Sequence, residues 1–187
     1  MKRRLFIAIL LPEEFKNRLL EAPKFFTGLP EPARWIKAEN LHLTVLFLGW
    51  IKEEFVSVIK NLPLLTIVSN GRFFDLRMEK IILAPPERRP RMVWAQFQKS
   101  SELENLKNQL YQEIKCSGLK IQEEKRISRP HITLCRFREA SRKIFEYFPE
   151  IEINVRLPVK SIALMESRLY RSGAEYQLLA EYHLTQR

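Results

Sequence analysis

The chain contains one short pattern twice, as HLTV at residues 42–45 and as HITL at residues 131–134. Each segment alternates polar side chains with aliphatic ones, which is the period of a β-strand with one buried face. Residues two apart in a strand point to the same side, so each segment presents one imidazole and one hydroxyl together. The chain has 3 histidines, and two of them lie in this pattern. The repetition predicts two motif strands that face a common cleft.

Two imidazoles in one cleft suit acid–base chemistry on a phosphate. The unperturbed pKa of histidine, about 6.5, allows one ring to be a neutral base while the other is a cationic acid. On a phosphodiester, one ring would activate water and the other would protonate the leaving oxygen. The hydroxyls of Thr44 and Thr133 can donate hydrogen bonds to phosphate oxygens. A symmetric pair of motifs leaves open which histidine is the acid and which is the base.

Two other kinds of catalytic site fit the sequence less well. Catalytic zinc usually has three protein ligands, and neither motif contains an acidic residue or a second histidine, so we expect no metal and no cofactor. Cys135 shares strand parity with His131 and can therefore line the cleft as a nucleophile. The matching position in the first motif is Leu46, which favours a packing role for the cysteine instead.

The composition points to a polyanionic partner. The chain carries 32 Lys+Arg against 22 Asp+Glu, a net charge of +10. Such a balance favours RNA, DNA or an acidic surface, and a solvated basic surface is the alternative. The cysteines Cys116 and Cys135 have neither disulfide-framework nor metal-ligand spacing, which favours a reducing, cytoplasmic setting. The apolar run 5–11 reads as a buried first strand rather than a signal peptide, and no run reaches transmembrane length, so we expect no membrane partner.

The hydrophobic periodicity predicts one α+β domain spanning residues 1–187. A capping-box pattern at Ser101–Glu104 marks the start of the clearest helix. Further helical segments are predicted from Pro12, over 52–62 and over 141–148. The predicted strands cover 5–11, 34–37, 41–48, 73–83 (as one or two strands), 91–97, 131–137, 159–166 and 175–184. Short links between neighbouring strands favour antiparallel pairing, and the 89 positions that separate the motifs suggest a duplicated unit.

Several segments, taken in order, resemble one protein family. They are Arg4–Ile9, Trp35–Gly49, Arg91–Trp94, Arg129–Arg136, Leu164–Leu169 and Leu179–Tyr182. Together they are similar to the two-histidine phosphoesterases, and among these to the RNA 2′,3′-cyclic phosphodiesterases, also called the 2′-5′ RNA ligase family. The resemblance implies a bilobal α+β fold, with two antiparallel sheets and flanking helices around a central cleft and with halves related by a pseudo-twofold axis.

The resemblance also implies an activity and a role for each site residue. It implies hydrolysis of RNA 2′,3′-cyclic phosphate ends to 2′-phosphate ends without metal, and reversible 2′-5′ ligation when a 5′-hydroxyl replaces water. His42 would be the proton donor and His131 the proton acceptor. Thr44, Thr133 and Arg136 would bind the substrate phosphate. The implied partner is RNA with cyclic phosphate ends, including tRNA fragments, acted on by a monomer.

Some alternatives remain open at this stage. Simple strand parity places Arg136 on the face opposite His131, so it would need a bulge, a strand end or a long reach to meet the phosphate. Trp35 and Phe47 can stack on a base or serve as core and rim residues. A nucleotide- or RNA-binding module without turnover, and a phosphoesterase for another cyclic nucleotide, also fit the two motifs.

Overall fold

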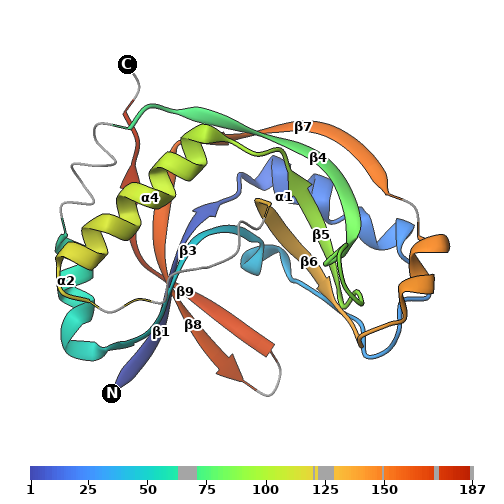
Figure 1. Cartoon of the computed structure of the whole chain (residues 1–187), viewed down its shortest axis with the longest axis horizontal. Coiled ribbons are helices and arrows are strands. Elements are labelled where there is room, and N and C mark those ends of the chain that lie inside the picture. Colours follow the sequence, from blue (N-terminus) through green and yellow to red (C-terminus); the bar gives the residue numbers. More distant parts are fainter. Residues whose placement is uncertain (63–70, 120, 122–128, 149, 171–172, 186–187) are drawn as a thin grey trace.

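The fold is built on one large antiparallel sheet. A computed structural model of the chain describes residues 1–62, 71–119, 121, 129–148, 150–170 and 173–185. Within these residues the sheet has 9 strands in the order β7-β4-β5-β6-β3-β1-β8-β9, with β2 paired to β6 (Figure 1). The strands are β1 (Lys2–Leu10), β2 (Arg34–Trp35), β3 (His42–Lys52), β4 (Phe74–Ala84), β5 (Met92–Phe97), β6 (His131–Arg136), β7 (Ile151–Val159), β8 (Ser161–Tyr170) and β9 (Gly173–His183).

The α+β class is confirmed, but the expectation of two sheets is wrong. The motif strands β3 and β6 are direct neighbours, and Leu43 pairs with Ile132 between them. This single register pair joins the two halves into one sheet. Sequence patterns could not predict the junction, because it depends on how closely two distant strands approach.

The two halves repeat one local arrangement. Each has a strand, a helix and a motif strand in that order: β1, α1 (Glu13–Leu19) and β3 in the first, and β5, α4 (Ser101–Cys116) and β6 in the second. In both halves the first strand pairs antiparallel with the motif strand. The predicted apolar face of α4 is buried, and its N-cap is Ser100, one residue before the capping box predicted from the sequence.

The remaining helical segments are shorter than expected. The predicted helix over 52–62 consists of the 3₁₀ turn η3 (Glu53–Phe55) followed by α2 (Val56–Asn61), and the piece over 141–148 is the 3₁₀ turn η4 (Arg142–Glu146). Two more 3₁₀ turns, η1 (Ala22–Phe25) and η2 (Ala38–Asn40), precede the first motif strand. No helix among the described residues is long and apolar enough to cross a membrane.

Strand β7 is not among the strands expected from the sequence. It pairs with β4 and lies at one edge of the sheet, where it runs along the top of the molecule in Figure 1. Its exposed face carries Glu152 and Arg156, and it contains Pro158. An edge strand tolerates a proline and charged side chains because one of its sides has no strand partner. Apolar and polar side chains nevertheless alternate throughout residues 151–159, so the period-two pattern of a strand is present in the sequence, and only the proline argues against it.

Gly49 does not end the first motif strand, as its position suggested, but lies at a bulge within it. Leu5 pairs with Gly49 and Phe6 with Phe47, so Leu48 is an extra residue on β3. The φ of Gly49 is +78°, in the left-handed region that L-residues rarely adopt. The strand then continues to Lys52.

We expect Gly49→Ala to lower the free energy of unfolding by about 1–2 kcal/mol, because the added Cβ disfavours the left-handed backbone. The Cβ itself would meet nothing within 4 Å, so the loss reflects backbone strain alone. Urea unfolding of both proteins measures it. Gly49→Asn is the matched control and should lose less, since asparagine tolerates this conformation better. Equal stabilities of wild type and Gly49→Ala would contradict the argument.

Candidate active site

All five residues singled out from the sequence line one cavity. They are His42, Thr44, His131, Thr133 and Arg136, and the cavity has a volume of about 1080 Å³. Strand β1, strand β5, helix α4 and the β8–β9 hairpin also contribute to its wall. The prediction that both motifs face a common cleft is therefore confirmed.

The register of the two motif strands explains the shared cavity. Leu43 and Ile132 pair directly and are fully buried on the core face of the sheet. Their neighbours in sequence point to the opposite face because side chains alternate along a strand. In this antiparallel register His42 lies across from Thr133, and His131 lies across from Thr44. Each imidazole therefore has a hydroxyl from the other motif beside it.

A bulge brings Arg136 to the cavity. Residues 131–136 have the burial pattern intermediate, buried, intermediate, buried, buried, exposed, and two adjacent buried residues break the simple alternation. The pairing of β5 with β6 shifts at the same place, where Trp94 pairs with Thr133 but Val93 with Cys135. The extra residue reverses the parity beyond it, so Arg136 returns to the face of His131. Residues 42–47 show the same pattern, which places Phe47 at the equivalent position.

The same bulge removes Cys135 from the cleft. Its side chain is fully buried in the main hydrophobic cluster. Burial raises the pKa of its thiol to about 11, which keeps it protonated at neutral pH. Cys135 is a packing residue, as the match with Leu46 indicated, and not a nucleophile facing the cleft.

Both motif histidines are anchored through the same ring nitrogen. Nδ1 of His42 donates to the carbonyl oxygen of Asn40 at 2.8 Å, and Nδ1 of His131 donates to that of Arg129 at 3.0 Å. A carbonyl oxygen only accepts, so each neutral ring must carry its proton on Nδ1. Each Nε2 then has a lone pair in the neutral ring and an N–H in the cationic ring. This tautomer is the one that lets Nε2 exchange protons with a ligand.

The surroundings of His42 are aromatic and enclosed. Its ring centroid is 5.0 Å from that of Phe6, and it lies edge-on to Tyr176 at 4.8 Å. Burial lowers the pKa of His42, the carbonyl of Asn40 opposes this, and the positive charges of Arg136 and His131 lower it further. The free protein therefore favours the neutral ring at this position.

His131 stacks on an indole instead. Its ring is 3.8 Å from that of Trp94, with an interplanar angle of 19°. Among the described residues Trp94 Nε1 is a buried donor without a hydrogen-bond partner. The stacked ring fixes the orientation of the imidazole, and an aromatic face attracts its cationic form.

The sequence motifs do not predict these aromatic contacts. Trp94 belongs to a segment that resembles the family, but its sequence does not mark it as a site residue. Nothing in the sequence pattern singles out Tyr176. Both come from strands outside the motifs, β5 and β9, so only the folded arrangement reveals their contacts.

The described residues contain no group of three or more His, Cys, Asp or Glu side chains that could hold a metal ion. The polar groups of the cavity are imidazoles, hydroxyls, amides and cations, apart from Glu104. These groups suit an anionic ligand.

Two His-x-Thr strands side by side, with both imidazoles anchored over one cavity, define the two-histidine class of site. Comparisons with known proteins place the chain within that class. Residues 12–184 match the family model described as the AKAP7 2′5′ RNA ligase-like domain. The chain belongs to the 2′-5′ RNA ligase and RNA 2′,3′-cyclic phosphodiesterase family.

Curated relatives match nearly end to end. The RNA 2′,3′-cyclic phosphodiesterase of Escherichia coli K12 is 32% identical over 187 residues, covering 98% of each chain. That of Thermotoga maritima is 30% identical and covers 95% of this chain and 94% of the relative. These full-length homologues are enzymes, RNA 2′,3′-cyclic phosphodiesterases.

Solved structures show the same fold. A Thermus thermophilus protein, TT0787, superposes with a TM-score of 0.81 at 26% identity over 98% of each chain. E. coli LigT in complex with 3′-AMP superposes with a TM-score of 0.77 at 30% identity over 100% of each chain.

Proposed function

We propose that this protein hydrolyses RNA 2′,3′-cyclic phosphate ends to 2′-phosphate ends with His42 and His131 as an acid–base pair. The observation that carries the proposal is the matched anchoring of the two imidazoles over one cavity, in which Nδ1 of each ring donates to a backbone carbonyl and Nε2 is the nitrogen that would exchange protons. The full-length match to RNA 2′,3′-cyclic phosphodiesterases supports the substrate class.

The reaction is a single displacement at phosphorus. His131 Nε2 takes a proton from water, and the water oxygen forms a bond to phosphorus. The bond from phosphorus to the 3′ oxygen breaks, and His42 Nε2 gives its proton to that oxygen. The products are a 2′-phosphate and a 3′-hydroxyl. A 5′-hydroxyl in place of water attacks the cyclic phosphate by the same proton transfers and forms a 2′-5′ bond.

Three side chains would stabilise the charge that develops on the phosphate. Thr44 and Thr133 donate from opposite motif strands to the non-bridging oxygens, and Arg136 supplies a guanidinium from the bulged end of β6. Groups already directed at the developing charge stabilise a transition state more than mobile water does.

The assignment of His42 as the acid follows the family resemblance, and it is in tension with the lowered pKa of His42. The substrate resolves this tension. A cyclic phosphate is an anion, and an anion beside an imidazole favours its protonated form. Binding would therefore charge His42 in the complex, although the free protein favours the neutral ring.

The setting proposed for the enzyme is the cytoplasm, where it would act on RNA ends, including tRNA fragments, as a monomer. Its two cysteines support a reducing compartment, because Cys116 and Cys135 are both free thiols.

The direct test uses purified protein in excess EDTA with an RNA oligonucleotide that ends in a 2′,3′-cyclic phosphate. We expect the terminal product to be a 2′-phosphate, identified by mass and by its resistance to a 3′-specific phosphatase. An unchanged end would favour a binding module or another cyclic nucleotide as substrate. Activity that appears only after metal is added would overturn the mechanism.

A further inference from the structure

Three exposed arginines gather at one end of the cavity, and we name them the arginine cluster: Arg34, Arg91 and Arg136. Arg34 on β2 pairs directly with Arg136 on β6, so their side chains share one face of the sheet. Arg91 lies beside the same strand, where its carbonyl accepts from the Phe137 amide at 3.0 Å. Arg91 and Arg136 line the cavity, and Arg34 extends the cluster outward.

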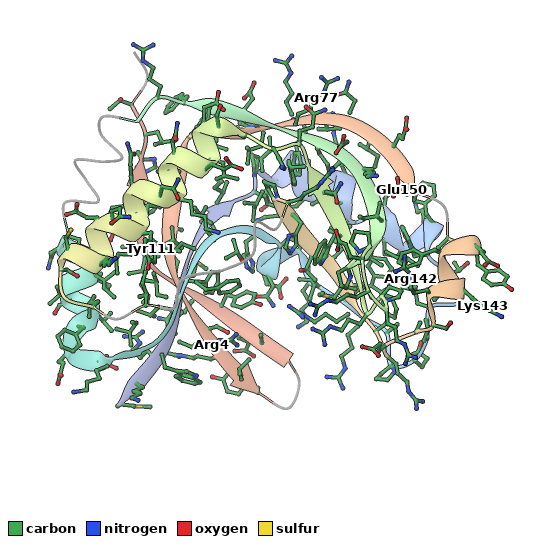
Figure 2. All side chains as sticks on the ribbon, in the orientation of Figure 1. Arg4, Arg77, Tyr111, Arg142, Lys143 and Glu150 are labelled. Atoms are coloured by element: carbon green, nitrogen blue, oxygen red, sulfur yellow. The ribbon has the colours of Figure 1, made fainter. Side chains whose placement is uncertain are left out.

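No carboxylate among the described residues neutralises the positive charge of this cluster. These residues form no ion pair with any of its members, and the guanidinium of Arg136 donates a single hydrogen bond there, to the sulfur of Met92 at 3.6 Å. Six other arginines pair with carboxylates, and the rest of the described arginines, such as Arg4 and Arg138, do not. The six are Arg3, Arg18, Arg89, Arg129, Arg156 and Arg168. Arg142 lies at the same end of the molecule (Figure 2), and its guanidinium donates to the carbonyl of Glu87.

Like charges directly opposite each other on paired strands are destabilising. Arg34 and Arg136 occupy such a pair, and their Cα atoms are about 5 Å apart in an antiparallel ladder. A bound anion would relieve this repulsion. Arg136 faces the reacting phosphate in the proposed mechanism, so Arg34 and Arg91 extend the positive charge to where a second phosphate would lie.

Both ends of the cavity carry cations, but among the described residues only the end away from the arginine cluster has carboxylates beside them. At that end, Arg129 pairs with Glu79 at 3.4 Å, and Glu104 lies in the cavity wall with Lys99 and Lys107. The position in β3 that matches Arg136 is Phe47, which is 48% exposed. In a ribonucleotide the base is attached at C1′, and the 5′ phosphate is reached through C4′, on the other side of the ring oxygen. An aromatic side chain towards one end of the cavity and the arginine cluster at the other therefore match the base and the 5′ phosphate of a terminal nucleotide.

We propose that the arginine cluster binds the phosphodiester on the 5′ side of the terminal nucleotide. The enzyme then selects oligonucleotide ends over mononucleoside 2′,3′-cyclic phosphates. This proposal rests on the proposed function for its catalytic readout, but the RNA contact can be measured without turnover. Arg136 lies between the two phosphates, while Arg34 and Arg91 contact only the upstream one.

The catalytic test compares kcat/KM for a mononucleoside 2′,3′-cyclic phosphate with that for an oligonucleotide carrying the same terminal base. We expect wild type to favour the oligonucleotide, and Arg34→Gln to reduce the ratio about tenfold, the effect of losing one charge-assisted contact. Arg156→Gln, on the edge strand β7, makes the same charge change away from the cavity and should keep the ratio. Equal preference in wild type, or an equal fall in both variants, would overturn the proposal.

A binding measurement tests whether the arginine cluster binds RNA independently of whether the enzyme hydrolyses it. The probe is a fluorescent oligonucleotide that already ends in a 2′-phosphate, titrated by anisotropy at several salt concentrations. Each phosphate contact contributes about 0.7 to the slope of log affinity against log salt for a single strand. Arg34→Gln should reduce the slope by about that amount, and Arg156→Gln should not. If neither cyclic substrate reacts, the catalytic proposal fails. An unchanged salt slope for Arg34→Gln would separately overturn the proposal that the arginine cluster binds the upstream phosphate.

Discussion

Replacement of His42 or His131 by alanine is expected to lower kcat on a cyclic phosphate end by a factor of about 10²–10⁴. Each substitution removes the only group that can move a proton on its side of the phosphate in the proposed mechanism. Nδ1 of each ring donates to a local backbone carbonyl, and both rings lie on the cavity face rather than in the core. The fold should therefore persist. The measurement is single-turnover hydrolysis of the cyclic oligonucleotide in excess EDTA.

The third histidine provides the matched control. His183 is exposed at the end of β9 and pairs with Ser161, away from the motif strands. His183→Ala should hydrolyse the substrate at the wild-type rate. Circular dichroism and thermal unfolding of all three variants would show whether a lost rate reflects lost structure. Near-normal turnover by either folded motif variant would disprove the acid–base pair.

The same variants can assign the two roles. If the bridging 3′ oxygen of the substrate is replaced by sulfur, the leaving thiolate departs without a proton. A variant that lacks the acid should then recover most of its rate, and one that lacks the base should not. The proposed assignment predicts recovery for His42→Ala alone. Recovery for His131→Ala alone would exchange the two roles and would agree with the neutral His42 favoured in the free protein.

Local sequence pattern was enough to predict which motif side chains line the cavity. Alternation placed His42 with Thr44 and His131 with Thr133, since each pair is two residues apart within an uninterrupted stretch of strand. The same rule failed for Arg136 and Cys135, because a bulge lies between them and the motif. A bulge depends on the partner strand, and no pattern in residues 131–136 alone specifies it.

Longer-range features were harder to predict for the same reason. The contact between Leu43 and Ile132 makes one sheet of the two that were expected. The stacking of Trp94 on His131 and the edge contact of Tyr176 with His42 join elements far apart in the chain. Each of these contacts depends on the register between strands. The hydrophobic pattern determines which face of a strand is buried, but it does not say which residues of two distant strands pair.

The second large effect is expected in the pH dependence. We expect kcat/KM to be bell-shaped and to fall about tenfold per pH unit on each limb, because one imidazole must be neutral and the other protonated. Burial lowers the pKa of His42, and the nearby Arg136 charge adds to this, so one limb should reflect a group that titrates below about 6.5. Steady-state rates from about pH 4 to about pH 10 would define both limbs.

The profile of kcat should differ from that of kcat/KM, since kcat reports the complex and kcat/KM the free enzyme. The anionic substrate should raise the pKa of His42, so the corresponding limb should lie at higher pH in kcat. An NMR titration of the free protein isolates the cause. Arg136→Gln removes one cation that lowers the pKa of His42, so the midpoint of His42 should rise while the effect of burial remains. A flat profile from about pH 5 to about pH 9 would rule out proton transfer by these two rings, whatever their separate roles.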